Sequence, residues 1–364
     1  MLKTKFALFL FFLFAFAPLA LAQTPTPTPK DDEENIFTEE IKLNISAVNS
    51  AGNFAPNVKA EDLVINEDNI LHQADTVRRI PANVLLVLDT GGDLRMAKNI
   101  NQTRSTAISL IDSLREGDSV AVIEYSDKAE ILAEWTTDKT ALKRVLKDKL
   151  NFGRRSTFVD AMKLANEFLR KSKVENQHLV LITDGTDSVN DVSERNAAFR
   201  ELLETSVSVH VVSYTRMEIA RVEPKAKRLS KNPPPKAMPD EVAAQLPNGV
   251  RDFKTAPKIG PTINMDKAMI QKMSDRKAAL KESEDYLATL ADDTSGQFVL
   301  PESNDEMIEK TALVAKIIDA NYVITYTPKR ALSESKPGEI RSIEVTSKRP
   351  GLQVQARRKL IIER

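Results

Sequence analysis

Residues Val84 to Arg95 read VLLVLDTGGDLR, and this stretch decides how the rest of the chain is interpreted. Five apolar residues in a row are typical of a strand that is buried on both faces of a parallel sheet. They lead directly into Asp89-Thr90-Gly91, and an acid at the end of a buried strand indicates a chemical role. Two interpretations are open at this point: the catalytic turn of an aspartic protease, or a turn that binds a cation.

Strands and helices alternate after this stretch. Apolar residues at helical spacing predict helices near 95–114, 137–150, 158–170 and 190–202, and apolar runs predict strands at 120–125, 178–183 and 207–214. Residues 129–135 are expected to form a hairpin with 120–125. This alternation predicts an α/β fold, a Rossmann-like, doubly wound, mostly parallel sheet with helices on both faces.

The segments around this domain differ from it in composition. Two lysines, an apolar run and Ala20-Leu21-Ala22 are typical of a signal peptide over 1–22, with an uncleaved anchor as the alternative. QTPTPTP predicts a Thr/Pro-rich linker over 23–37. We expect a small β unit at 38–80, the α/β domain at 81–327 with a proline-rich insertion at 217–265, and a β hairpin or cap at 328–364 that pairs with the N-terminal unit.

Bulk composition excludes several functions. The 364 residues include 52 Lys+Arg and 52 Asp+Glu, so no general attraction to nucleic acid or to an acidic membrane is expected. The absence of cysteine excludes disulfides, and a metal site would need oxygen or histidine ligands. With the predicted signal peptide, we expect an exported protein, periplasmic or secreted.

The protease interpretation fails on context. An aspartic protease needs two carboxylates that share one proton across an all-β dimer or two-lobed fold. The chain contains no second Asp-Thr-Gly or Asp-Ser-Gly, and the turn enters an α/β alternation instead. We therefore reject catalysis by Asp89-Thr90-Gly91.

The cation interpretation gains from the positions of other polar residues. In a parallel α/β sheet ligands bind at the carboxyl ends of the strands. Three loops are expected there, and their candidate donors are Asp89 and Asp93, Ser156 or Thr157, and Asp184. These hard oxygen donors suit Mg²⁺, Mn²⁺ or Ca²⁺.

The order of these motifs resembles a von Willebrand factor A (VWFA) domain with its metal-ion-dependent adhesion site. That family carries Asp-x-Ser-x-Ser after the first buried strand, a Thr four residues before a helical Asp, and an Asp-Gly after a later buried strand. Asp89 matches the first motif and Asp184 the third, while Ser156 stands four residues before Asp160. Residues 57–77, 321–328 and 345–358 further resemble the flanking segments of exported, acidobacterial-type VWFA-related bacterial proteins.

The resemblance implies a module that binds a protein partner, which the sequence does not identify. Gly91 and Asp93 stand where the family has serines, so it implies a degenerate site. Either this site still binds Mg²⁺ or Ca²⁺, with weaker coordination of a partner carboxylate, or Asp93 turns outward and no ion binds. The alternatives are a metal-dependent hydrolase and a metal-free cell-envelope structural protein. No general base or nucleophile motif is found, so we do not expect an enzyme.

Overall fold

The computed structural model describes residues 39–92, 100–189, 191–227 and 267–362, with short described pieces at 229–230, 238–244, 246–247, 250–251, 255 and 262–263. The predicted signal peptide, the predicted linker and Asp93 lie outside the described residues. Within the described part, no helix has the length and apolar character needed to span a membrane.

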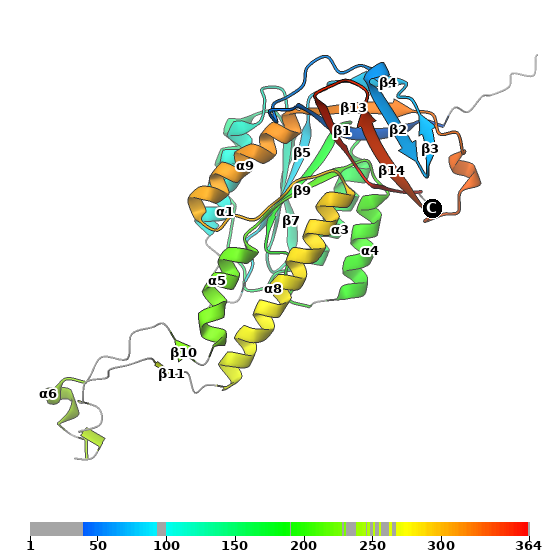
Figure 1. Cartoon of the computed structure of the whole chain (residues 1–364). Helices are drawn as coiled ribbons and strands as arrows, with labels where there is room; N and C mark the ends of the chain where they lie inside the picture. The colour runs from blue at the N-terminus through cyan, green and yellow to red at the C-terminus, as the bar shows by residue number, and fades with distance from the viewer. Residues whose placement is uncertain are drawn as a thin grey trace, which may run out of the picture. The chain divides into compact units, whose positions relative to one another are not determined.

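The centre of the fold is a six-stranded sheet in the order β12-β9-β8-β5-β6-β7 (Figure 1). Parallel pairing joins every neighbouring pair except β6 and β7, which form the predicted antiparallel hairpin. The strands are β5 (Asn83–Asp89), β6 (Ser119–Tyr125), β7 (Ala129–Thr136), β8 (Gln177–Thr183), β9 (Ser208–Ser213) and β12 (Phe298–Val299). The predicted mostly parallel α/β sheet is therefore confirmed, and the all-β fold of an aspartic protease is not present in the described residues.

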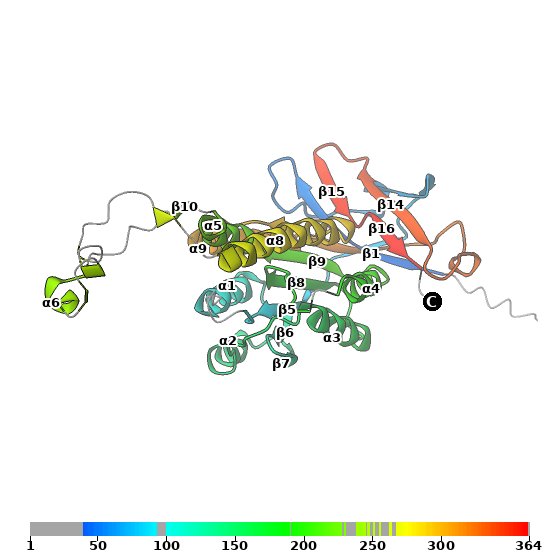
Figure 2. The same ribbon diagram turned by 90° about the horizontal axis from the view of Figure 1, so that it is seen from below.

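Helices cover both faces of this sheet, as the end-on view in Figure 2 shows. One apolar cluster joins Leu86 and Leu88 of β5 to three helices, and a second joins Leu85 and Val87 to three others. The helices of the first cluster are α1 (Ile100–Ser113), α2 (Lys139–Asp148) and α9 (Asn304–Asp319). The helices of the second cluster are α3 (Phe158–Lys171), α4 (Val192–Leu203) and α8 (Lys267–Asp293). Successive side chains of a strand point to opposite faces, so the continuous apolar run of β5 fills both clusters.

The N- and C-terminal segments together build a flanking β unit of two four-stranded sheets, β15-β1-β13-β4 and β16-β14-β2-β3. Its strands are β1 (Ile41–Asn49), β2 (Leu63–Glu67), β3 (Ile70–His72), β4 (Thr76–Arg78), β13 (Asn321–Tyr326), β14 (Ile340–Ser347), β15 (Leu352–Ala356) and β16 (Lys359–Ile361). The expected pairing of the C-terminal hairpin with the N-terminal unit is confirmed, because β15 pairs with β1 and β14 pairs with β2.

Sheet pairing crosses one predicted boundary. β13 pairs with β1 and β4, so it joins the flanking unit although the α/β domain was expected to extend to 327. β3 and β4 are close together in the sequence but lie in different sheets.

The first residues of the insertion predicted at 217–265 lie in a helix, α5 (Thr215–Ala226). Pro224 lies in the last turn of α5, where its nitrogen has no hydrogen to donate to the carbonyl oxygen of Ala220. Val222 of α5 packs against Met273 and Leu280 of α8, and this apolar contact stabilises the helix despite the proline. Short elements follow, namely β10 (Leu229–Ser230), α6 (Asp240–Ala243) and β11 (Thr262–Ile263).

Candidate binding site at the carboxyl edge of the sheet

Asp89 and Asp184 meet at the carboxyl ends of two neighbouring parallel strands. Asp89 ends β5, and Asp184 directly follows β8, which pairs with β5. The chain leaves β5 for β6 on one side and later returns to β8 on the other, so the two acids lie at the switch point where α/β sheets bind ligands. Both side chains are fully buried.

Local hydrogen bonds fix the Asp89 carboxylate. The Gly91 backbone N–H donates to its Oδ1 at 3.1 Å, and the Thr183 hydroxyl donates to its Oδ2 at 3.1 Å. Thr183 Oγ1 also lies 2.6 Å from the buried Tyr125 hydroxyl. The first predicted site residue is therefore held in place by both adjacent strands.

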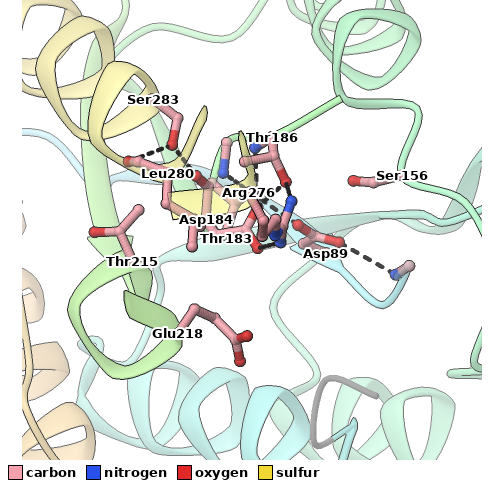
Figure 3. Close-up of polar contacts among 12 residues, drawn as sticks. Asp89, Ser156, Thr183, Asp184, Thr186, Thr215, Glu218, Arg276, Leu280 and Ser283 are labelled. Carbon is pink, nitrogen blue, oxygen red and sulfur yellow. Dashed lines mark hydrogen bonds and ion pairs between the residues drawn. The ribbon is translucent and has the colours of Figure 1, made fainter. Parts of the chain in front are cut away.

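The second predicted loop contains Ser156 and Thr157, whose hydroxyls differ in their contacts. The Ser156 side chain is buried, and its hydroxyl points toward the two acids in Figure 3. Among the described residues this hydroxyl has no hydrogen-bond partner. The Thr157 hydroxyl instead donates to the Ser126 carbonyl oxygen at 3.1 Å, so it is already engaged. Of the two alternatives left open by the sequence, Ser156 is the one whose hydroxyl forms no hydrogen bond within the described ranges.

An arginine that the sequence did not indicate also enters the site. Arg276 of α8 donates from Nη2 to Asp184 Oδ2 at 2.8 Å and from Nη1 to Thr186 Oγ1 at 2.6 Å (Figure 3). Thr186 in turn donates from Oγ1 and from its backbone N–H to Asp184 Oδ1, at 2.6 and 2.9 Å. Burial alone would lower the pKa of Arg276, but the charges of Asp184, Glu218 and Asp89 outweigh it and raise that pKa.

Helix α8 holds the Asp184 turn through one of its faces. The Ser283 hydroxyl donates to the Asp184 carbonyl oxygen at 2.6 Å, and the Tyr286 hydroxyl donates to the Gly185 carbonyl oxygen. Residues 276 and 283 are seven positions apart, or about two helical turns, so they project from the same side of α8. Gly185 has φ +73°, and a Cβ there would lie 2.6 Å from Leu287 Cδ1, so α8 packs directly on this turn.

The surrounding loops are tied to one another and form an exposed rim. Asp127 Oδ1 accepts the backbone N–H groups of Arg154 and Arg155, at 3.1 and 2.8 Å. The Ser188 N–H donates to the Ser156 carbonyl oxygen at 2.8 Å. Two apolar side chains on these loops face solvent, Val189 with 79% and Phe152 with 36% of its surface exposed. We call residues 152–155 and 187–189 the rim.

The donors that the structure describes do not fit a divalent cation as they are arranged. Both oxygens of Asp184 already accept hydrogen bonds, from Arg276 and Thr186, and the Thr157 hydroxyl donates to the Ser126 carbonyl oxygen. In the described ranges, no three His, Cys, Asp or Glu side chains gather into a metal-binding group. Because Asp93 lies outside those ranges, the Mg²⁺ or Ca²⁺ site at Asp89, Asp93, Ser156, Thr157 and Asp184 stays a prediction.

Comparison with known proteins identifies the central part of the chain. Residues 84–186 match the family model of the von Willebrand factor type A domain. An uncharacterized protein of Synechocystis sp. is 29% identical over 120 residues, which cover 32% of this chain and 28% of that protein. Inter-alpha-trypsin inhibitor heavy chain H4 of Bos taurus is 26% identical over 133 residues, 34% of this chain and 14% of that protein. The matched parts thus span less than a third of either relative.

Several solved structures are also similar to this chain. A von Willebrand factor type A protein from Catenulispora acidiphila has a TM-score of 0.43 at 10% identity, covering 85% of this chain and 74% of the other. The BatB protein of Bacteroides thetaiotaomicron has a TM-score of 0.35 at 15% identity, covering 65% and 98%. The manganese-loaded TRAP protein of Plasmodium vivax has a TM-score of 0.37 at 11% identity, covering 87% and 97%.

Proposed function

This chain carries a von Willebrand factor type A domain, and on that premise we propose that it is an exported binding module that contacts a protein partner through the rim. Domains of this family commonly mediate protein–protein interaction and are generally not enzymes. The narrower resemblance to exported, acidobacterial-type bacterial proteins stays a prediction. Export rests on the sequence of residues 1–22 alone.

The observation that carries this proposal is the construction of the rim. Its loops are joined by hydrogen bonds between their backbones and side chains, so the apolar groups of Val189 and Phe152 are presented on a fixed frame. A protein interface needs apolar anchors that are already positioned, because ordering a flexible loop costs binding free energy. Arg154 and Arg155 stand exposed beside them and supply the polar margin of such an interface.

Site-specific photo-crosslinking tests where the partner binds. A photoreactive amino acid is placed at Val189 or at Phe152 in the full chain, and at Glu116 as the control. Glu116 is exposed and lies before β6, at the opposite end of the strands. The variants are irradiated in the envelope and secreted fractions of the organism that encodes the chain. We expect one discrete adduct from both rim positions and none from Glu116; the same adduct from Glu116, or adducts from Glu116 alone, would contradict the proposal.

No described feature favours either alternative function. A metal-dependent hydrolase would need a general base near Asp89 and Asp184, and Arg276 binds Asp184 there instead. A metal-free structural protein of the cell envelope predicts no discrete adduct at any of the three positions. The crosslinking result therefore also separates a structural protein from a binding module.

A further inference from the structure

The Asp89–Asp184 pair poses an electrostatic problem. Both carboxylates are fully buried, and a buried charge without a counter-charge is strongly unfavourable. In the resembling family a divalent ion supplies the counter-charge. Here Arg276, whose side chain is 24% exposed, lies against Asp184 at 2.8 Å.

We propose that Arg276 is the resident cation of this site, that it takes the place of a divalent ion, and that the domain folds and contacts its partner without metal. The expectation that the domain contacts its partner without metal rests on the proposed function. The assignment of Arg276 as the resident cation does not, because it concerns the isolated chain.

The guanidinium group suits this place better than an ion does. It is planar and presents parallel N–H donors, which here reach both Asp184 and Thr186 in a closed ring of hydrogen bonds. Ser283 and Tyr286 bind the same turn from the same helix, so the position of Arg276 is set by α8 and not by its own flexible stem.

The geometry at Gly91 supports the same conclusion independently. A Cβ at position 91 would lie 1.8 Å from the Arg155 carbonyl oxygen and 3.1 Å from Ser126 Cα. These are backbone atoms, so the loop around Arg155 fills the space where a serine of the first motif would place its hydroxyl. The site has thus lost a metal ligand in a way that a single substitution does not restore.

The hydrogen bonds of Arg276 also bear on recognition. Its guanidinium already donates to Asp184 and to Thr186, so it is engaged within the site. We therefore expect the partner to be held by the rim and binding to be insensitive to chelators.

A double-mutant cycle on the purified full chain tests the assignment. We compare the melting temperatures of the parent, Arg276→Met, Asp184→Asn, the double variant, and Arg216→Met as the control. Arg216 lies on neighbouring α5 and forms ion pairs while being half exposed.

Losing a buried counter-charge should lower the melting temperature of Arg276→Met by roughly 5–10 °C. Adding Asp184→Asn to it should recover much of that loss, and Arg216→Met should change little. Equal losses for Arg276→Met and Arg216→Met, or strictly additive effects in the cycle, would overturn the assignment.

Calorimetric titration of the parent chain with Mg²⁺, Ca²⁺ or Mn²⁺ needs no variant and covers the case in which Arg276→Met does not fold. We expect no saturable heat and no rise in melting temperature with any of these ions. Saturable binding that Asp184→Asn abolishes would show that an ion displaces Arg276, and would overturn the proposal. Neither the mutant cycle nor the metal titration involves a partner. A result that overturns the assignment of Arg276 is therefore distinguishable from a crosslinking result that overturns the proposed function.

Discussion

At the scale of single residues, Gly91 is the position where the chain departs most clearly from the serine-rich motif. We predict that Gly91→Ser destabilises the protein by about 1–3 kcal/mol and creates no metal binding, because its Cβ would overlap the Arg155 carbonyl oxygen. Gly91→Ala is the control, since it introduces the same Cβ without a hydroxyl that could bind an ion. Urea denaturation with and without Mg²⁺ measures both effects. If Gly91→Ser is as stable as the parent and becomes more stable in Mg²⁺, the loop around Arg155 moves aside to admit the serine, and the prediction is wrong.

Ser156 provides a second test at the same scale. Its buried hydroxyl has no partner in the described part of the chain, so Ser156→Ala should leave the free energy of unfolding unchanged or raise it by up to about 1 kcal/mol. Thr157→Val removes a hydroxyl that is hydrogen-bonded and should cost about 0.5–1.5 kcal/mol. Both are measured by urea denaturation in a chelator and again in Mn²⁺. A cost for Ser156→Ala that appears only with Mn²⁺ would indicate that the hydroxyl ligates an ion.

At the scale of elements, α8 stabilises the site because one of its faces binds the turn after β8. Ser283→Ala removes the bond to the Asp184 carbonyl oxygen, and we predict a loss of about 1 kcal/mol together with faster hydrogen exchange at the Thr186 amide. Thr289→Ala, which removes an exposed bond within α8 itself, should leave that amide unchanged. Exchange measured by NMR or mass spectrometry reports both. Unaltered protection of Thr186 in Ser283→Ala would contradict the role of α8.

The same helix shows which part of the site the sequence does not reveal. Apolar residues such as Leu280, Leu287 and Leu290 predict a helix here, and the structure confirms it. Arg276, however, lies among other charged residues of a polar helix face, nearly a hundred positions after Asp184. No spacing rule joins two residues so far apart, because their contact depends on how α8 crosses the end of the sheet.

At the scale of the whole molecule, two buried histidines make the fold sensitive to acid. His178 of β8 and His210 of β9 lie 3.1 Å apart between Nδ1 and Nε2. The Gln297 N–H donates to His210 Nδ1, so His210 Nε2–H donates to His178, whose Nε2–H then donates to Asn176 Oδ1. This chain of bonds requires both rings to be neutral. Burial lowers the pKa of His210 to about 3, and burial together with the neighbouring His210 lowers that of His178.

The pH dependence follows from these shifts. Unfolded histidine has a pKa of about 6.5, so between pH ~6.5 and ~3 the unfolded chain binds more protons and stability falls as pH falls. We predict that the free energy of unfolding drops by about 2 kcal/mol for His210 alone between pH ~7.5 and ~5. Urea denaturation at the two pH values measures the drop, which His210→Gln should reduce. An equal drop in the parent and in His210→Gln would exclude this origin.

The overall architecture followed from the sequence more completely than the site did. The buried run of β5, the strand–helix alternation and the hairpin of β6 and β7 each left a local pattern, and local patterns determine a doubly wound sheet. The placing of β13 in the flanking unit and the separation of β3 from β4 depend on pairing between distant segments, which no local pattern contains. Asp89 and Asp184 were found because the fold itself brings strand ends together.

A crystal structure of the full chain grown in Mn²⁺ tests the central claim, the replacement of the metal by Arg276, most directly. Anomalous scattering distinguishes manganese from water and from lighter ions. We predict no anomalous peak between Asp89 and Asp184, and guanidinium density 2.8 Å from Asp184 Oδ2. A manganese peak bound by Asp89, Ser156 and Asp184, with Arg276 turned away, would contradict it.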